Sequence, residues 1–224
     1  MAHLEIEIKS LLGSQANADA LLAKMRSLDS ELVQTSTNSQ LNHYFEGGSL
    51  LAVQATTAHL FTPEQAVKLA MIVERATEFS LRTRKRDAEV LLVVKASVDA
   101  GSAANTVSRL EFEEPVALTL EALDQLLLEA GFTYQAKWSR TRQEYAYKGI
   151  TVCFDKNAGY GYLAEFEKVV PDGTSVEDTR AEIELLMAEL AVEELDQDRL
   201  ARMFSHYNQN WAEYYGTEDI FVIQ

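Results

Sequence analysis

Residue types that often determine fold or location are scarce in this 224-residue sequence, which has one cysteine and three prolines. The lone cysteine, Cys153, excludes an intrachain disulfide and is consistent with a reducing compartment. No apolar run approaches the ~20 residues that a membrane-spanning helix needs. The first residues also lack the basic and then apolar pattern of a signal peptide. We therefore expect a cytoplasmic protein with no membrane partner.

Cations are outnumbered, because 20 Lys and Arg residues accompany 35 Asp and Glu residues, a formal net charge of −15. Binding to a phosphate backbone favours basic surfaces, so this balance argues against a nucleic-acid partner. The sequence has no G-x-x-x-x-G-K-[ST] motif, which excludes phosphate binding by a P-loop. The four histidines show no metal-ligand spacing, and Cys153 is interpreted as a packing residue rather than a nucleophile.

Apolar and polar residues alternate with period 2 in several stretches, and helical patterns fill the gaps. Strands are expected near residues 4–9, 42–46, 79–86, 90–97, 106–116, 138–147, 150–156 and 162–170. Helices are expected near residues 15–30, 62–79, 118–132, 175–192 and 196–216. Thr62, Pro63 and Gln65 form a capping box with proline in the first turn, and Gly131 is a helix stop. The pattern predicts an α+β fold with a mostly antiparallel sheet.

Charged side chains recur two residues apart on several expected strands. The segment LEIEIK places Glu5, Glu7 and Lys9 on one face of the first strand and its apolar residues on the other. The other E-x-E and R-x-R pairs are Glu111/Glu113, Glu165/Glu167, Arg82/Arg84 and Arg140/Arg142. A solvated face of an antiparallel sheet is one explanation. Like charges on one face repel, however, so segregated acidic and basic rows are more typical of a site that holds metal ions beside a polyanion.

An antiparallel eight-stranded β-barrel with surrounding helices and a helical C-terminal part would give these rows a common interior. Carboxylates are suitable ligands for Mg²⁺ or Mn²⁺, which often share substrate phosphates. Arginine and lysine side chains bind phosphate oxygens. The ligand that this pattern indicates is therefore a metal-bound, multiply charged phosphate chain.

The E-x-E-x-K of LEIEIK resembles the signature of the CYTH, or triphosphate tunnel metalloenzyme, superfamily. That family contains class IV adenylyl cyclases, thiamine triphosphatases and inorganic tripolyphosphatases. The chain continues in the family's order with NHYFE, LRTR, the lysine of VVKAS, RLEFE, KWSR, the aspartate of VCFDK, and AEFE. The resemblance covers about residues 1–170. It implies one CYTH-like domain over 1–224, with a helical insertion at about 47–79 and C-terminal helices over 174–215.

The resemblance also implies roles for individual positions. The expected metal ligands, direct or through water, are Glu5, Glu7, Glu111, Glu113, Asp155, Glu165 and Glu167. The expected phosphate-binding cations are Arg82, Arg84, Lys95, Arg109, Lys137, Arg140 and Arg142. Lys95 is expected on the same face of its strand as apolar residues, so its phosphate-binding role comes from the resemblance alone. Lys137 and Arg140 are three residues apart, so on a regular strand their side chains would point to opposite faces. A bulge or a strand start must therefore separate them if both point inward.

Lys9 and Tyr44 are the expected catalytic pair, again by resemblance. They would position an attacking water and help to deprotonate it, for which desolvation or neighbouring cations would lower the pKa of Lys9. The alternative for Tyr44 is an amphipathic residue at the mouth of the barrel. The expected reaction is metal-dependent hydrolysis of inorganic tripolyphosphate or of an organic triphosphate such as thiamine triphosphate or a nucleotide.

Two other functions remain open at this point. A class IV adenylyl cyclase would convert ATP to cyclic AMP and pyrophosphate with the same groups, and a polyphosphate or nucleotide sensor would bind without turnover. The insertion at about 47–79 is interpreted as a packing element, with a lid as the alternative. The aromatic stripe over residues 204–215 is typical of a core or of a homodimer surface.

Overall fold

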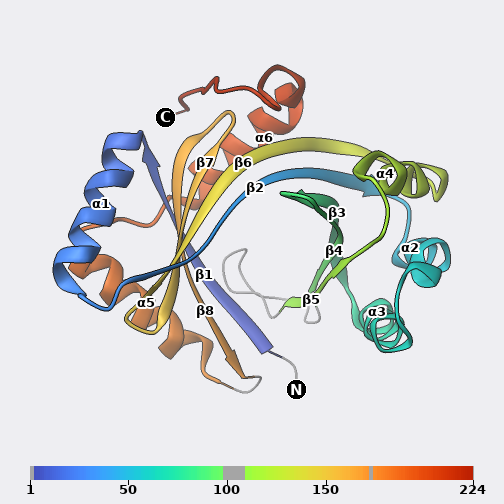
Figure 1. Ribbon diagram of the computed structural model, residues 1–224, viewed down its shortest axis with the longest axis horizontal. Helices are drawn as coiled ribbons and strands as arrows, with labels where there is room; N and C mark the ends of the chain where they lie inside the picture. Colours follow the sequence, from blue (N-terminus) through green and yellow to red (C-terminus); the bar gives the residue numbers. More distant parts are fainter. Residues whose placement is uncertain (1–2, 98–108, 172–173, 224) are drawn as a thin grey trace. The chain divides into compact units, whose positions relative to one another are not determined.

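A sheet of eight antiparallel strands and six α-helices makes up the described part of the chain, residues 3–97, 109–171 and 174–223 of the computed structural model (Figure 1). The strands are β1 (His3–Gly13), β2 (Val33–Gly47), β3 (Glu78–Arg86), β4 (Glu89–Ser97), β5 (Arg109–Pro115), β6 (Phe132–Tyr147), β7 (Ile150–Asn157) and β8 (Gly161–Pro171). The helices are α1 (Gln15–Leu28), α2 (Leu50–Thr57), α3 (Pro63–Arg75), α4 (Leu120–Glu129), α5 (Val176–Leu190) and α6 (Gln197–Tyr214).

The strand order is β1-β8-β7-β6-β2-β3-β4-β5, and every register that the structure gives is antiparallel. The predicted α+β class and eight antiparallel strands are therefore confirmed. Among the described residues, no helix combines the length and the apolar character that a membrane span requires.

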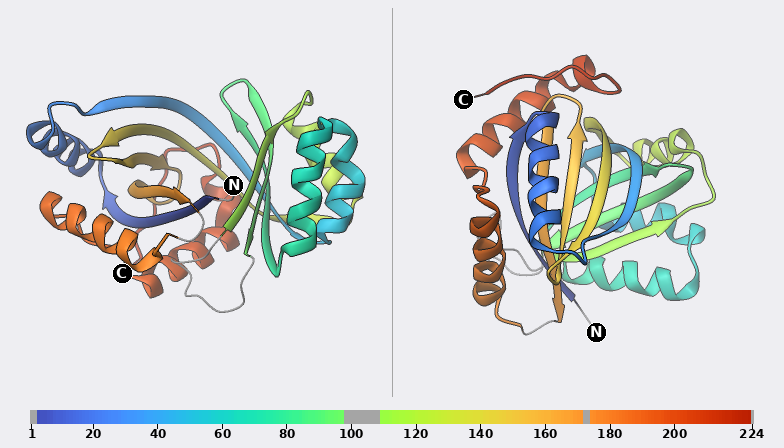
Figure 2. Two further views of the ribbon diagram at one scale, coloured as in Figure 1. Left: turned by 90° about the horizontal axis from the view of Figure 1, so that it is seen from below. Right: turned by 60° about the vertical axis from the view of Figure 1, so that its left-hand side comes forward.

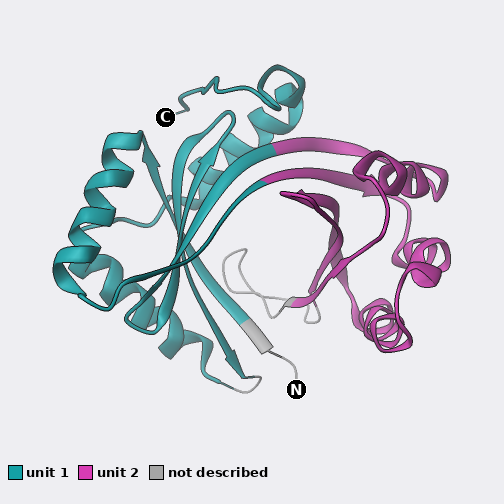
Figure 3. Cartoon of the chain, in the orientation of Figure 1, with its two compact units in different colours: residues 1–39, 103–106, 139–224 teal, residues 40–102, 107–138 magenta. Residues whose placement is uncertain are grey.

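The described residues divide into two compact units (Figure 3). Unit 1 holds those of residues 1–39 and 139–224, and unit 2 holds those of 40–102 and 107–138. Strands β2 and β6 each contribute one segment to unit 1 and one to unit 2. The prediction that residues 1–224 form a single domain stays a prediction.

Unit 1 has its own hydrophobic core between the sheet and two helices. Helices α1 and α5 pack on β1 and β8 (Figure 2). Ile8, Phe166 and Val152 are fully buried in this core. Burial of each such side chain contributes about 1.5–3 kcal/mol, which holds the strands in place. Because side chains alternate across a strand, the neighbours of these residues point to the opposite face.

Unit 2 has a separate core, formed by β3, β4 and β5 under α2, α3 and α4. Leu92, Val94 and Phe112 are fully buried there. On β4 the residues of the opposite face, Leu91 and Val93, are buried as well. This is why the alternation along β4 could not be read from the sequence, whereas that of β3 and β5 was clear.

The predicted helix signals are confirmed at two places. The Thr62 hydroxyl accepts a hydrogen bond from the Gln65 amide, and the Gln65 side chain accepts one from the Thr62 amide. Gly131 follows α4 with a φ of +90°, a conformation that favours glycine. The α3 helix ends at Arg75 rather than near residue 79, because Glu78 and Phe79 already pair with β4.

The insertion at about 47–79 contains more structure than one helix. It holds α2, a short 3₁₀ turn (Ala58–Leu60), α3 and the start of β3. Helix α2 begins after Ser49, whose hydroxyl accepts a hydrogen bond from the Ala52 amide. Its Leu50 and Val53 are buried in the core of unit 2, which agrees with a packing role.

The aromatic stripe of α6 contributes to packing within unit 1. Tyr207 is fully buried, with its ring 5.5 Å from that of Tyr160, and Tyr214 stacks on Tyr207. The C-terminal segment adds Phe221, whose amide donates a hydrogen bond to the carbonyl of Gly159. The core interpretation therefore holds for Tyr207, and a homodimer stays a prediction.

We expect Gly161→Ala to destabilise the protein more than Gly149→Ala. Both glycines have positive φ, +74° and +83°, which strains an alanine by about 1–2 kcal/mol. A Cβ at Gly161 would also lie 2.5 Å from the carbonyl oxygen of Gly13, whereas one at Gly149 meets nothing within 4 Å. Chemical denaturation should show that Gly161→Ala lowers the free energy of unfolding by about 1–3 kcal/mol more than Gly149→Ala does. Equal losses would contradict this contact.

Candidate functional site

Charged residues occupy the face of the unit 1 strands opposite the helix-packed core. We call this the charged face of unit 1, and its residues are Glu5, Glu7, Lys9, Arg140, Arg142, Asp155, Glu165 and Glu167. The strand registers bring them together, since Glu7 lies opposite Glu167, Lys9 opposite Glu165, and Arg142 opposite Asp155. The face therefore combines residues that the sequence predicted on four separate segments, which form β1, β6, β7 and β8.

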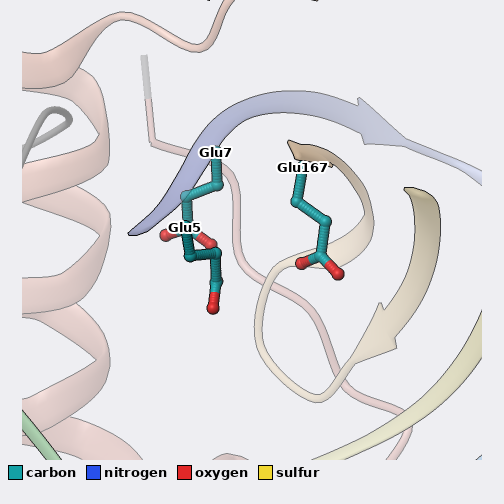
Figure 4. Close-up of side chains that lie close together, drawn as sticks. All are labelled: Glu5, Glu7 and Glu167. Carbon is teal, nitrogen blue, oxygen red and sulfur yellow. The ribbon is translucent and has the colours of Figure 1, made fainter. Parts of the chain in front are cut away.

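Three carboxylates of this face form an acidic cluster (Figure 4). Each of Glu5, Glu7 and Glu167 offers an oxygen atom, and these atoms lie within 4.8 Å of one another. Burial, followed by the charges of Glu5 and Glu165, raises the pKa of Glu167 to about 7. A divalent cation would relieve this repulsion, and three carboxylate oxygens are a donor set that Mg²⁺ and Mn²⁺ prefer. The cluster thus fits the predicted metal.

Asp155 and Glu165 are bound to arginines rather than grouped with this cluster. Arg142 donates to the two oxygens of Asp155 at 2.7 and 2.6 Å, and Arg140 donates to one of them at 2.7 Å. Arg142 also donates to Glu165. Burial alone would raise the pKa of Glu165, but Arg142, Lys9 and Arg140 hold it well below its usual range. These two carboxylates therefore position cations, and their role as metal ligands stays a prediction.

Lys9 lies between the acidic cluster and the arginines. Its ammonium is 2.5 Å from an oxygen of Glu7 and 3.4 Å from one of Glu165. Burial lowers the pKa of Lys9, but the charges of Glu165 and Glu7 outweigh that effect and raise it above its usual range. The expected lowering of this pKa is therefore wrong for the arrangement seen here, in which Lys9 is an ammonium.

Cys153 also lies on this face, paired in register with Glu165. It is fully buried, and burial raises the pKa of its thiol. A thiol that resists deprotonation is a poor nucleophile. This agrees with the packing role expected from the sequence.

A second charged surface covers the face of unit 2 opposite its helices. We call it the charged face of unit 2, and its residues are Asn42, Tyr44, Arg82, Arg84, Lys95, Glu111 and Glu113. The Arg82 guanidinium donates a hydrogen bond to the Tyr44 hydroxyl and lies 5.2 Å from the centroid of that ring. Lys95 forms an ion pair with Glu111, its partner in register.

Arg84 is held from two sides. Its Nε donates to the side-chain oxygen of Asn42 at 2.7 Å, and its Nη1 donates to both oxygens of Glu113 at 3.0 and 3.1 Å. Burial would raise the pKa of Glu113, but Arg84, Arg82 and Arg86 lower it. Sequence reasoning missed Asn42, although its position two residues before Tyr44 places both on one face of β2.

The remaining predicted residues of unit 2 are less informative. Lys137 lies over the ring of Tyr134, 4.0 Å from its centroid, and the Tyr134 hydroxyl donates to Asp124 of α4. Arg109 begins β5, but its side chain lies outside the described residues. Phosphate binding by either residue stays a prediction.

A family model described as CYTH domain matches residues 73–201, more than half of the 224-residue chain. The match includes the predicted site residues from Arg82 to Glu167, whereas Glu5, Glu7, Lys9 and Tyr44 precede it. No curated protein matches the sequence.

Several solved structures share the fold. A protein of Pyrococcus horikoshii OT3 is 19% identical with a TM-score of 0.61, covering 85% of this chain and 92% of its own. A candidate adenylate cyclase from Vibrio parahaemolyticus is 15% identical with a TM-score of 0.58, covering 92% and 99%. A candidate adenylyl cyclase from Hippeastrum, for which a dominant triphosphatase activity is described, is 18% identical with a TM-score of 0.52, covering 91% and 96%.

We expect Glu167→Gln to weaken cation binding at the acidic cluster. The substitution keeps the shape of the side chain but removes one of three anionic ligands, so the Kd for Mn²⁺ should rise about tenfold or more. Calorimetric titration of the metal in the absence of phosphate measures this directly. Glu189→Gln is the matched control, because Glu189 pairs with Lys148 at an exposed site in the same unit. Equal affinities in the two variants would contradict the assignment.

We also expect Glu113→Gln to destabilise the protein in a pH-dependent way. The pKa of Glu113 is lowered from 4.5 in the folded state, so its ion pairs stabilise that state above pH 4.5 and cease to do so as the pH falls through the lowered value. Urea denaturation should show that the variant has a lower free energy of unfolding than the unmodified protein at pH 7, and that this difference becomes smaller in acid. Glu74→Gln, at an exposed site of α3, should show little change at either pH. A loss for Glu113→Gln that is independent of pH would contradict the pKa shift.

Proposed function

Because the chain belongs to the CYTH-domain family, we propose that it hydrolyses a triphosphate with the help of a divalent cation, Mg²⁺ or Mn²⁺. The observation that carries this proposal is the juxtaposition within unit 1 of Glu5, Glu7 and Glu167 with the arginine-bearing part of the same face. A cation site beside guanidinium groups suits a metal-bound phosphate chain.

Different residues of unit 1 are proposed to bind the metal ion and the phosphate oxygens. Glu5, Glu7 and Glu167 would hold the cation, which when bound neutralises phosphate charge and polarises the reacting phosphorus centre. Arg140, Arg142 and Lys9 are cations already held in position by carboxylates. Phosphate oxygens would replace part of these carboxylate contacts, so little side-chain order has to be created on binding.

Arg82, Arg84 and Lys95 of unit 2 are proposed to bind phosphate oxygens as well. Each is paired with a polar or acidic neighbour that orients it. Arg109 and Lys137 join this set by family membership alone. Tyr44, whose hydroxyl accepts a hydrogen bond from Arg82, is proposed as a catalytic residue from the resemblance of NHYFE alone.

Lys9 acts as a cation in this proposal. Its ammonium, held by Glu7 and Glu165, would stabilise the negative charge of the transferring phosphoryl group and orient the water rather than accept a proton. This differs from the base role expected from the sequence and keeps Lys9 among the catalytic residues.

The substrate is proposed to be inorganic tripolyphosphate or an organic triphosphate. Support comes from the Hippeastrum protein, which shares the fold and for which a dominant triphosphatase activity is described. The second candidate is ATP cyclisation, which the candidate adenylate cyclase of Vibrio parahaemolyticus favours. The two reactions differ in the nucleophile, which is water in one and the ribose 3′-hydroxyl in the other.

Phosphorus NMR separates these reactions in one experiment. The purified protein with Mg²⁺ is given tripolyphosphate in one tube and ATP in another, and both are repeated with Mn²⁺. Orthophosphate from either substrate supports the hydrolase. Pyrophosphate with a cyclic phosphodiester signal from ATP would establish the cyclase, and no product from any tube would contradict hydrolysis of these two substrates.

We expect Lys9→Ala to lower turnover at least about a hundredfold while tripolyphosphate binding is weakened but still measurable, because one of several cations is removed. The matched control is Lys168→Ala, since Lys168 belongs to β8, points to the opposite face and pairs with Glu182. Phosphate release and calorimetric binding measure the two effects. Unchanged turnover in Lys9→Ala would remove Lys9 from the mechanism.

A further inference from the structure

Three consecutive cross-strand pairs join β2 and β3 in unit 2. Asn42 lies opposite Arg84, His43 opposite Thr83, and Tyr44 opposite Arg82. Because side chains alternate across a sheet, the first and third pairs share the charged face of unit 2. The middle pair points to the other face, toward the helices.

Each arginine of these pairs is held by the residue opposite it. Arg84 donates to the side chain of Asn42, and Arg82 donates to the hydroxyl of Tyr44. Arg84 is buried, so its position depends closely on the backbone that carries it. A shift of the backbone at Thr83 would move both arginines together, since they flank it in the chain.

The middle pair is tied to helix α4 by one buried carboxylate. Asp124 accepts a hydrogen bond from the Thr83 hydroxyl at 2.5 Å, and its other oxygen contacts the His43 ring nitrogen Nδ1 at 2.6 Å. The Tyr134 hydroxyl of β6 donates to that second oxygen at 2.7 Å. Asp124 is 3% exposed, His43 4% and Thr83 0%. Three strands are thus attached to the same side chain.

A purely apolar contact between α4 and the sheet would be enough to pack the helix stably. Replacing buried polar groups by well-packed apolar ones is often neutral or stabilising, so stability alone does not require this network. What a fully satisfied buried network adds is a single geometry, because any slip leaves a buried polar group without its partner. The network therefore fixes a single position of α4 against β2, β3 and β6.

We propose that Asp124 and Thr83 are positioning residues, which set the places of Arg82 and Arg84 on the opposite face for phosphate binding, together with that of Tyr44, which holds Arg82. The proposal rests on the proposed function, since it concerns the same phosphate-binding groups. None of the network residues touches the ligand in this account. They act through the backbone of β2 and β3.

Thr83→Val tests the proposal with little change in shape. The substitution removes the hydroxyl that Asp124 binds, and we expect the Kd for inorganic tripolyphosphate to rise about tenfold, because misplacement of groups by about 1 Å can reduce function up to a hundredfold. Thr83→Ser, which keeps a hydroxyl, should restore most of the affinity. Calorimetric titration without added metal measures binding with no turnover.

Thr57→Val is the matched control. Thr57 is also fully buried in unit 2, and its hydroxyl donates to the carbonyl of Val53 within α2. The Thr57→Val variant loses a buried hydrogen bond of the same kind within α2, outside the strands that carry the arginine pairs, and should leave the Kd unchanged. Tripolyphosphate affinity that falls equally in both variants would reduce the role of Thr83 to stability and overturn the proposal. If Thr83→Val does not fold, Tyr134→Phe removes another donor to Asp124 and carries the same expectation.

Variants of the arginines distinguish phosphate binding at Arg82 and Arg84 from the positioning role of Asp124 and Thr83. Arg82→Ala with Arg84→Ala should abolish most of the binding, and adding Thr83→Val to that double variant should have no further effect. Normal tripolyphosphate binding by the double variant would refute phosphate binding at these arginines, and with it the positioning role. Lost binding in the double variant together with normal binding in Thr83→Val would overturn the positioning role alone.

Discussion

Pairing between buried carboxylates and guanidinium groups is the constraint on which the two charged faces depend. A charged group removed from water is destabilising by several kcal/mol unless it is paired and hydrogen-bonded. Asp155, at 1% exposure, meets this condition through Arg140 and Arg142. Arg84 meets it through Glu113 and Asn42. Loss of one member of such a set leaves the other charge buried alone, which costs about 3–5 kcal/mol.

The same pairing prepares each face for an anion. Arginines that already sit in fixed geometry lose little rotamer freedom when phosphate oxygens approach. The acidic cluster of Glu5, Glu7 and Glu167 is the exception, because it gathers like charges, and burial together with neighbouring carboxylates raises the pKa of Glu167. A face that is neutralised in one part and repulsive in another is suited to a ligand that brings both phosphate and a cation.

Local patterns predicted the strands and caps well, because alternation and capping depend on residues near one another in the chain. The Thr62 capping box, the stop at Gly131 and the separation of β1 and β8 into an apolar and a charged face were all evident from the sequence. Helix α2 was missed as a separate element because it is short and lacks a charged stripe. The start of β2 was missed because residues 34–40 are all polar and show no alternation, and the start of β6 at Phe132 lies ahead of the range that the charged pattern marks.

Partner choice within the site could not be predicted. Whether Asp155 binds metal or arginine depends on the register between β6 and β7, and the pKa of Lys9 depends on a glutamate far away in the chain. The contacts of Asp124 join residues 41 and 81 positions apart. No spacing rule in one segment carries such information, so Asn42, His43 and Thr83 gave no signal beyond their parity on β2 and β3.

The burial of Cys153 has a practical consequence for the study of this protein in solution. Its thiol is shielded and its pKa is raised, so alkylating reagents and maleimide probes, which attack the thiolate, will modify it slowly. A cysteine introduced at an exposed position will therefore be labelled selectively without removal of the native one. Two such positions, one in each unit, would allow fluorescence transfer to follow the chain while phosphate and metal are added.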